Sequence, residues 1–377
     1  MTADTADTEA AVSRETISAA PPVDQEKPVT PSLPTAPSSP EPSRFGPAPA
    51  PGAAYRTAGD YALGASALDD STPLARTVEQ ELMVRAGLHL RGPLPRPPQT
   101  RVMVVANQKG GVGKTTTTVN MAAALAQGGL RVLVVDLDPQ GNASTALSID
   151  HHRGTLSTYD AIVDGTDLAE IVQPSPEIEH LFVVPATIDL AGAEIELVSM
   201  VARESRLRKA LHAHPQILAD TEDRFDYVLI DCPPSLGLLT LNALVAGDEM
   251  LIPIQAEYYA LEGLGQLLET VEMVKAHLNP GLDVSTIVLT MYDARTRLSA
   301  GVAEEVRGHF GDQVLRTAIP RSVRISEAPS YGQTVMTYDP SSPGALSYLE
   351  AAREMAFRVE PEAAAAASTI ANQGEAR

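Results

Sequence analysis

The 377-residue sequence contains little cysteine, little aromatic character and an excess of acidic over basic residues. Its single cysteine, Cys232, excludes an internal disulfide framework and any metal or iron–sulfur site built from several cysteines of one chain. Aromatic residues make up 4% of the chain and hydrophobic residues 44%, so we expect an aliphatic core. No apolar run approaches the ~18 residues that span a membrane. Because the N-terminus is also acidic, unlike a basic signal peptide, we expect a cytoplasmic protein.

Proline divides the chain into two parts. Of the 30 prolines, 16 lie between Pro21 and Pro98, among alanine, serine and threonine. Such a stretch buries too little apolar surface to offset the entropy of ordering it, so residues 1–98 are predicted to form a largely disordered extension. Residues 71–90 interrupt it with apolar side chains at helical spacing: Leu74, Val78, Leu82 and Ala86. A transient helix and a helix that docks on a partner or on the folded body both fit this pattern.

Between residues 99 and 360, apolar runs of strand length alternate with segments of helix length. Strands are predicted at 102–106, 132–136, 181–185, 227–231, 250–253 and 287–291. Helices are predicted at 115–127, 194–213, 261–278, 299–310 and 345–359. Several strand runs are apolar throughout, which is typical of strands covered on both faces. The alternation predicts one α/β domain with a doubly wound, mostly parallel sheet, followed by a disordered tail at 361–377.

A glycine-rich loop follows the first predicted strand and precedes the first predicted helix. It consists of Lys109, Gly110, Gly111, Val112, Gly113, Lys114, Thr115 and Thr116. Glycines let successive backbone N–H groups point into one concavity, and the following helix N-terminus makes this concavity more positive. In such a loop, Lys114 reaches the β- and γ-phosphates of a nucleotide and the Thr115 hydroxyl binds Mg²⁺. The spacing therefore predicts a P-loop nucleotide site.

Lys109 stands where the ordinary P-loop pattern has glycine. A lysine there cannot be explained by backbone curvature, and lysine binds phosphate as a point charge. We interpret Lys109 as a residue that extends to a phosphate, which a neighbouring copy of the chain could hold. A solvated surface lysine is the alternative interpretation.

Three aspartates follow predicted strands. Alternation places Asp136 and Asp138 on one side of the extended chain, at the strand end where α/β sheets bind ligands. One carboxylate there can hold hydrated Mg²⁺ and another can orient an attacking water, although an Asp-Pro pair can also merely cap the next segment. Asp231 is the last residue of an apolar predicted strand. In P-loop enzymes, the second element on the Mg²⁺ side of the site is likewise an apolar strand that ends in aspartate. The adjacent Cys232 has no activating base nearby and is interpreted as a small packed side chain.

Taken together, these motifs resemble the ParA/Soj family of chromosome and plasmid partitioning ATPases, within the deviant Walker A group that also contains MinD. The resemblance runs from about residue 101 to 355. Besides NQKGGVGKTTT (107–117) and VVDLDPQGNAS (134–144), it includes PATIDLAGAEIEL (185–197), DCPPSLGLLTLNAL (231–244), QAEYYALEGL (255–264), TMYDARTRLS (290–299) and IPRSVRISEAPSYG (319–332).

The resemblance implies an ATP-dependent switch. Two subunits close around two ATP molecules, the closed dimer binds double-stranded DNA of the nucleoid without sequence preference, and hydrolysis stimulated by a ParB-like protein releases it. Lys109 matches the signature lysine that crosses to the other subunit's ATP, and Asp138 matches the carboxylate needed for hydrolysis. Lys114 and Thr115 match the phosphate and Mg²⁺ residues, and Asp231 matches the Walker B aspartate.

Further positions take their roles from the same resemblance. Gly110 is where the two subunits pack closely in relatives, so a side chain there is expected to block closure. By similarity, the adenine pocket lies near Met291 and Pro320.

Arginines that contact DNA in relatives match Arg295 and Arg324, with Arg297 and Arg321 beside them. Residues 1–98 carry 8 basic and 12 acidic side chains, so the remainder of the chain carries a formal charge of −16. A field of that sign repels DNA, and only a clustered basic patch, doubled by dimer closure, could overcome it. A solvated or salt-bridged arginine face is the alternative.

Several rival functions fit the sequence less well. A MinD-like membrane-positioning ATPase needs a basic amphipathic C-terminal helix, whereas the sequence after residue 360 is rich in alanine and polar residues. A nitrogenase-reductase-like electron carrier needs paired cysteines. A repressor of this group would carry a helix-turn-helix before the ATPase, where this chain is proline-rich. A relative that positions another cargo on the nucleoid stays open, because the partner determines the cargo.

Overall fold

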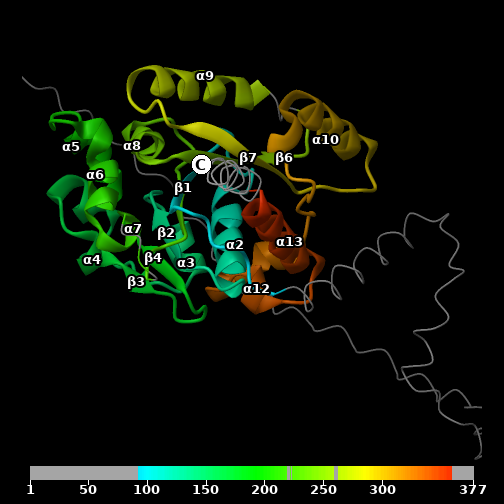
Figure 1. Cartoon of the computed structure of the whole chain (residues 1–377), viewed down its shortest axis with the longest axis horizontal. Helices are drawn as coiled ribbons and strands as arrows, with labels where there is room; N and C mark the ends of the chain where they lie inside the picture. The colour runs from blue at the N-terminus through cyan, green and yellow to red at the C-terminus, as the bar shows by residue number, and fades with distance from the viewer. Residues whose placement is uncertain (1–91, 219–220, 222, 259–261, 359–377) are drawn as a thin grey trace, which may run out of the picture. The chain divides into compact units, whose positions relative to one another are not determined.

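The computed structural model describes residues 92–218, 221, 223–258 and 262–358 (Figure 1). The predicted helix at 71–90 and the predicted tail lie outside these residues. Within them, the strands are β1 (Arg101–Val105), β2 (Val132–Asp136), β3 (Gln173–Pro174), β4 (Leu181–Val184), β5 (Tyr227–Asp231), β6 (Glu249–Gln255) and β7 (Asp283–Thr290). Most of the predicted strands thus begin or end within two residues of an observed one.

In the described part of the chain, these strands form one sheet with the order β3-β4-β2-β5-β1-β6-β7. Every neighbouring pair is parallel except β3 with β4. From β1 the chain crosses to β2 and β4 on one side, returns through β5 between β2 and β1, and continues to β6 and β7 on the other side. This reversal of direction places the connecting helices on both faces of the sheet. The predicted fold class, a doubly wound and mostly parallel α/β sheet, is confirmed.

Helices of one to four turns connect and cover the strands. They are α2 (Lys114–Gln127), α3 (Asn142–Ala146), α4 (Leu168–Ile171), α5 (Leu190–Leu197), α6 (Arg206–Ala213), α7 (Pro215–Leu218), α8 (Leu238–Ala246), α9 (Glu262–His277), α10 (Arg297–Phe310), α11 (Val323–Glu327), α12 (Val335–Tyr338) and α13 (Pro343–Phe357). Short helical turns of other types lie at Asp160–Asp164 (η2), Arg203–Ser205 (η3), Gly311–Gln313 (η4) and Ala328–Tyr331 (η5).

The sheet separates two aliphatic cores. Met103 and Val105 of β1 face the core formed with α2 and α13, whereas Val102 and Val104 face the core formed with α5, α6, α8 and α9. Figure 1 shows α2 and α13 side by side, with α8 and α9 on the opposite face of the sheet. Every residue of β2 and β5 is buried, which explains why both runs are apolar up to their final aspartate.

The helix predicted at 194–213 is wrong in its extent. Helix α5 ends at Leu197, and Ala202 has a left-handed φ of 53° before the chain re-enters a helix at Arg206. Val198 and Val201 contribute to the apolar pattern, but their exposures are 60% and 88%, so they do not belong to the core stripe. Apolar spacing alone therefore joined two helices that the tertiary structure separates.

Residues 92–100 lie against the domain at the amino-terminal end of the sheet. Leu94 N donates to Gly128 O at 2.9 Å, and Arg96 Nε donates to the buried Asp226 Oδ1 at 2.8 Å. Thr100 Oγ1 donates to the backbone of Phe225 at 2.7 Å.

None of the helices in the described ranges is both long and apolar enough to span a bilayer.

Candidate functional site

The glycine-rich loop leaves β1 at the carboxyl edge of the sheet and is held there by neighbouring strands. The buried Asn107 donates from Nδ2 to Pro253 O at 2.9 Å and accepts from Lys109 N at 3.0 Å. Thr290 Oγ1, at the end of β7, donates to Val112 O at 2.8 Å. The ends of β6 and β7 thus fix both halves of the loop.

Two glycines give the loop its curvature. Gly111 has a φ of 74° and Gly113, which precedes the first residue of α2, has a φ of 88°. Residues with a Cβ rarely adopt this region, so glycine is required where the chain turns into the helix. In a loop of this curvature, successive backbone N–H groups can point into one concavity at the helix N-terminus, as a phosphate cradle needs.

Lys114 opens α2 with only 8% of its surface exposed. Burial lowers the pKa of its ammonium, and the nearby carboxylates of Asp231 and Asp138 oppose this effect. A buried cation at the N-terminus of a helix is suited to bind an anion with more than one negative charge.

Asp136 and Asp231 are opposite each other in the register of β2 and β5, and both are fully buried. Burial raises the pKa of each carboxyl group. Repulsion from Asp136 adds to the rise at Asp231, and repulsion from Asp138 adds to the rise at Asp136. Hydrogen bonds from Thr115 and Thr118 partly counteract it at Asp231.

The two aspartates differ in how their oxygens are used. Asp136 accepts from Ser144 N at 2.9 Å, from Ser144 Oγ at 2.7 Å and from Asp138 N at 3.2 Å. Asp231 Oδ1 accepts from Thr118 Oγ1 at 2.8 Å, but its buried Oδ2 has no hydrogen-bond partner in the described chain. A buried carboxylate oxygen without a donor, next to the Thr115 hydroxyl, fits a divalent cation that prefers oxygen ligands.

Asp138 follows β2 and is 8% exposed. Its Oδ1 accepts from Gln140 N at 3.0 Å, and its own N–H donates to Asp136. The backbone turn thereby holds this carboxylate at the same edge of the sheet as Lys114. The negative charge of Asp138 acts to raise the pKa of Lys114.

The signature-position lysine lies outside this buried group. The Lys109 side chain is 33% exposed, and its Nζ lies 4.0 Å from Glu257 Oε2. A Cβ built on the neighbouring Gly110 would meet no atom within 4 Å, so the single chain does not itself require glycine at this position.

Met291 and Pro320 lie in adjoining segments beyond the end of β7. Tyr292 pairs with Pro320 in a parallel bridge, and Tyr292 N donates to Ile319 O at 2.9 Å. Met291 has a φ of 50°, a backbone conformation that residues other than glycine, asparagine and aspartate seldom adopt. The structure thus brings together the two positions predicted near an adenine.

The four predicted DNA-contacting arginines are all exposed. Arg321 N donates to Tyr292 O at 3.1 Å, so the loop that carries Arg321 lies beside the loop that carries Arg295. Arg297 is the first residue of α10, and Arg324 lies in α11.

Acidic side chains already pair with three of these arginines. Their closest nitrogen–oxygen distances are 2.9 Å for Arg295 with Asp293, 3.2 Å for Arg321 with Glu257, and 3.2 Å for Arg324 with Glu327. The patch is therefore partly neutralised within the single subunit.

Sequence reasoning did not single out four residues that shape this site: Thr118, Ser144, Glu257 and Thr290. Thr118 lies one helical turn after Lys114, and this spacing could have identified it. Ser144 follows Asp136 by eight residues, in the helix after β2. Glu257 and Thr290 come from segments distant in sequence, and the strand order brings them to the loop.

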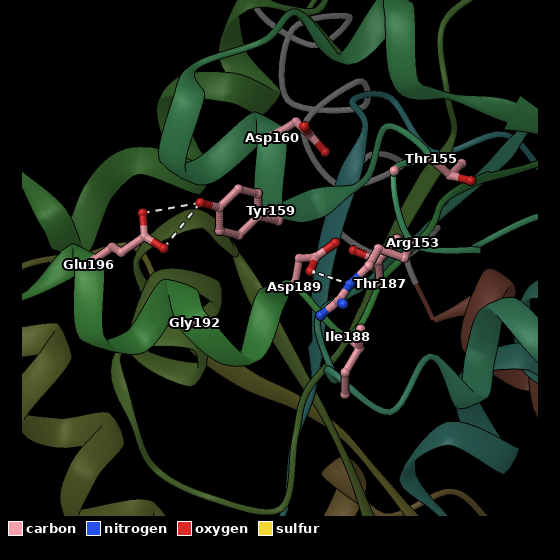
Figure 2. Close-up of a pocket in the computed structure, with 10 residues that line it drawn as sticks. Arg153, Thr155, Tyr159, Asp160, Thr187, Ile188, Asp189, Gly192 and Glu196 are labelled. Carbon is pink, nitrogen blue, oxygen red and sulfur yellow. Dashed lines mark hydrogen bonds and ion pairs between the residues drawn. The ribbon is translucent and has the colours of Figure 1, made fainter.

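A separate pocket of about 450 Å³ lies beyond the end of β4 (Figure 2). Figure 2 shows Arg153 directed toward Asp189 and Tyr159 toward Glu196. The Arg153 Nε–Asp189 Oδ1 distance is 3.3 Å, and Tyr159 Oη lies 3.1 Å from both Glu196 oxygens. The lining includes no residue of the glycine-rich loop, so this pocket is distinct from the candidate nucleotide site.

Comparison with known proteins gives consistent relatives. A family model described as an AAA domain matches residues 100–284. The sporulation initiation inhibitor protein Soj of Bacillus subtilis is 54% identical over 256 residues, which cover 68% of this chain and 98% of that protein. The chromosome partitioning protein ParA of Myxococcus xanthus is 50% identical over 262 residues, which cover 70% and 90% of the two chains.

A solved structure extends the comparison to bound ligands. The structure described as cobyrinic acid a,c-diamide synthase from Mycobacterium smegmatis, with bound ADP and magnesium, has a TM-score of 0.57 at 38% identity. The match covers 67% of this chain and 93% of that one.

Proposed function

The chain belongs to the Soj/ParA family of chromosome-partitioning ATPases, and we propose that it is an ATP-driven switch whose closed dimer binds DNA without sequence preference. It is an ATPase that uses ATP and Mg²⁺. The observation that carries the proposal is the buried Lys114 near Asp231, whose Oδ2 has no hydrogen-bond partner among the described residues, after a loop with two left-handed glycines.

In this proposal, the loop amides and Lys114 bind the β- and γ-phosphates of ATP. Thr115 and Asp231 hold Mg²⁺, which neutralises phosphate charge when bound. Asp136 is proposed to support this Mg²⁺ site without a direct bond to the ion, since Ser144 and the Asp138 backbone already donate to both of its oxygens. Met291 and Pro320 border the adenine.

Asp138 is proposed to orient the water that attacks the γ-phosphate. Its carboxylate lies at the same strand edge as Lys114 and is restrained by Gln140 N. A fixed carboxylate can accept a proton or a hydrogen bond from that water without reorganising during the reaction.

Dimer closure is proposed to depend on Lys109 and Gly110. The partly exposed Lys109 side chain can extend beyond its own subunit to the ATP of the second copy. Gly110 is exposed, and the open space around it within one subunit fits a position where a second backbone approaches.

Closure would place two copies of the arginine patch, Arg295, Arg297, Arg321 and Arg324, on one surface. Each phosphate contact contributes to affinity through counterion release, so doubling the contacts strengthens binding steeply. We further propose that a ParB-like protein stimulates hydrolysis and releases the DNA, and that the protein is cytoplasmic and associated with the nucleoid.

The test is DNA binding by the full chain with ADP, ATP and a slowly hydrolysed ATP analogue across a salt series. We expect binding with ATP and with the analogue, a logarithmic affinity that falls linearly with the logarithm of salt concentration, and little binding with ADP. Equal binding with ADP, or a chain that stays monomeric at saturating ATP, would contradict the proposal.

A further inference from the structure

Glu257 lies between two cations that belong to different parts of the proposed mechanism. Its Oε2 is 4.0 Å from Lys109 Nζ, and its Oε1 is 3.2 Å from Arg321 Nη2. Gln255 Nε2 donates to the same Oε1 at 2.6 Å and helps to orient the carboxylate. One acidic side chain therefore contacts both the signature-position lysine and an arginine of the DNA patch.

The strand order explains this arrangement. The loop with Lys109 follows β1, Glu257 follows β6, and these strands are neighbours in the sheet. Arg321 is joined to the segment after β7, the next strand, through its hydrogen bond to Tyr292 O. Three loops from separate parts of the sequence thus meet at one carboxyl edge.

Both cations must leave Glu257 to act as proposed above. Lys109 must extend to a phosphate in the second subunit, and Arg321 must turn to a DNA phosphate. The side chains of all three residues are between 33% and 59% exposed. Exposed ion pairs change an equilibrium constant by a factor of only about 1.5 to 5, so ATP or DNA can break them.

We propose that Glu257 is a positioning residue that restrains Lys109 and Arg321 together in the nucleotide-free subunit. This inference rests on the proposed dimer and DNA cycle. The added point is that one carboxylate makes both dimer closure and DNA binding less favourable. In the nucleotide-free subunit, Lys109 and Arg321 thereby stay paired with Glu257 until ATP and a second subunit are present.

The experiment compares Glu257→Gln with a matched control, Glu327→Gln, in the full-length chain. Glu327 pairs with Arg324 in the same patch but makes no ion pair with Lys109 in the described structure. Both variants remove one negative charge that pairs with an arginine of the patch. Glu257→Gln also removes the contact with Lys109, whereas in Glu327→Gln the released Arg324 still lies 3.4 Å from Asp339. Two quantities are measured: the dimer dissociation constant with a slowly hydrolysed ATP analogue, and the affinity of the ADP form for DNA at low salt.

For Glu257→Gln we expect tighter dimers, by about 2- to 25-fold because a two-fold dimer breaks two such contacts, and DNA affinity raised by about 1.5- to 5-fold or more. For Glu327→Gln we expect a change in DNA affinity alone. The restraint is refuted if Glu257→Gln leaves either quantity unchanged, or if both variants tighten the dimer equally. Wild-type protein in the same series separates the two hypotheses, because failure of wild type to dimerise or bind DNA refutes the proposed function itself.

Discussion

Two lysines of one loop allow a sharp test of the nucleotide site. Lys114 is 8% exposed and lies within electrostatic reach of Asp231 and Asp138, whereas the Lys109 side chain is 33% exposed and pairs with Glu257. We expect Lys114→Met to abolish ATP binding by the subunit that carries it. We expect Lys109→Ala to leave that binding within about 5-fold of wild type while preventing ATP-dependent dimerisation.

The magnitude follows from the contacts that each lysine is proposed to make. A hydrogen bond to a charged group contributes about 1.5–3 kcal/mol, and Lys114 would contact two phosphates, for a total of about 3–6 kcal/mol. Since about 1.4 kcal/mol corresponds to a factor of ten, ATP affinity falls by about 10²- to 10⁴-fold. Methionine retains most of the buried aliphatic stem, so packing around α2 is preserved.

Nucleotide affinity is measured by titration at protein concentrations too low for dimerisation, and dimerisation by light scattering at saturating ATP. Thermal unfolding of both variants checks that the fold is intact. The reasoning is refuted if Lys114→Met still binds ATP within tenfold of wild type. It is equally refuted if Lys109→Ala loses nucleotide affinity as severely as Lys114→Met, because Lys109 would then act within its own subunit.

Three further variants test other parts of the proposal. Asp138→Ala should retain ATP and accumulate as a DNA-bound dimer; phosphate release at the wild-type rate would overturn its assignment. Arg324→Glu should dimerise normally but bind DNA at least tenfold more weakly, with the salt slope reduced by about 2 because the dimer loses two contacts; undiminished affinity would remove Arg324 from the interface. Gly110→Val should fold with a thermal midpoint near that of wild type, since no atom lies within 4 Å of the added Cβ, and should fail to dimerise with ATP; normal dimerisation would argue against close packing there.

The fold class was predictable because its signals are local. The runs Val132–Asp136 and Tyr227–Asp231 are apolar up to their final aspartate, and the structure buries every residue in both. The segment 194–213 was not predictable at the same level. The exposed Val198 and Val201 continue the apolar spacing of a buried helix face. Alanine favours helices, so the sequence does not indicate the left-handed conformation of Ala202 that separates the two helices.

The site divides in the same way. The sequence by itself determined the glycine-rich loop, its two lysines and the aspartates at the strand ends, because a P-loop depends on residue spacing over a few positions. Only the tertiary structure decided that Ser144 donates to Asp136, that one buried oxygen of Asp231 has no partner within the described ranges, and that Glu257 lies between Lys109 and Arg321. The contact of Ser144 with Asp136 depends on how the chain turns after β2. The relations of Asp231 and Glu257 join segments that follow different strands, and the order β2-β5-β1-β6-β7, which no short segment encodes, determines which segments meet.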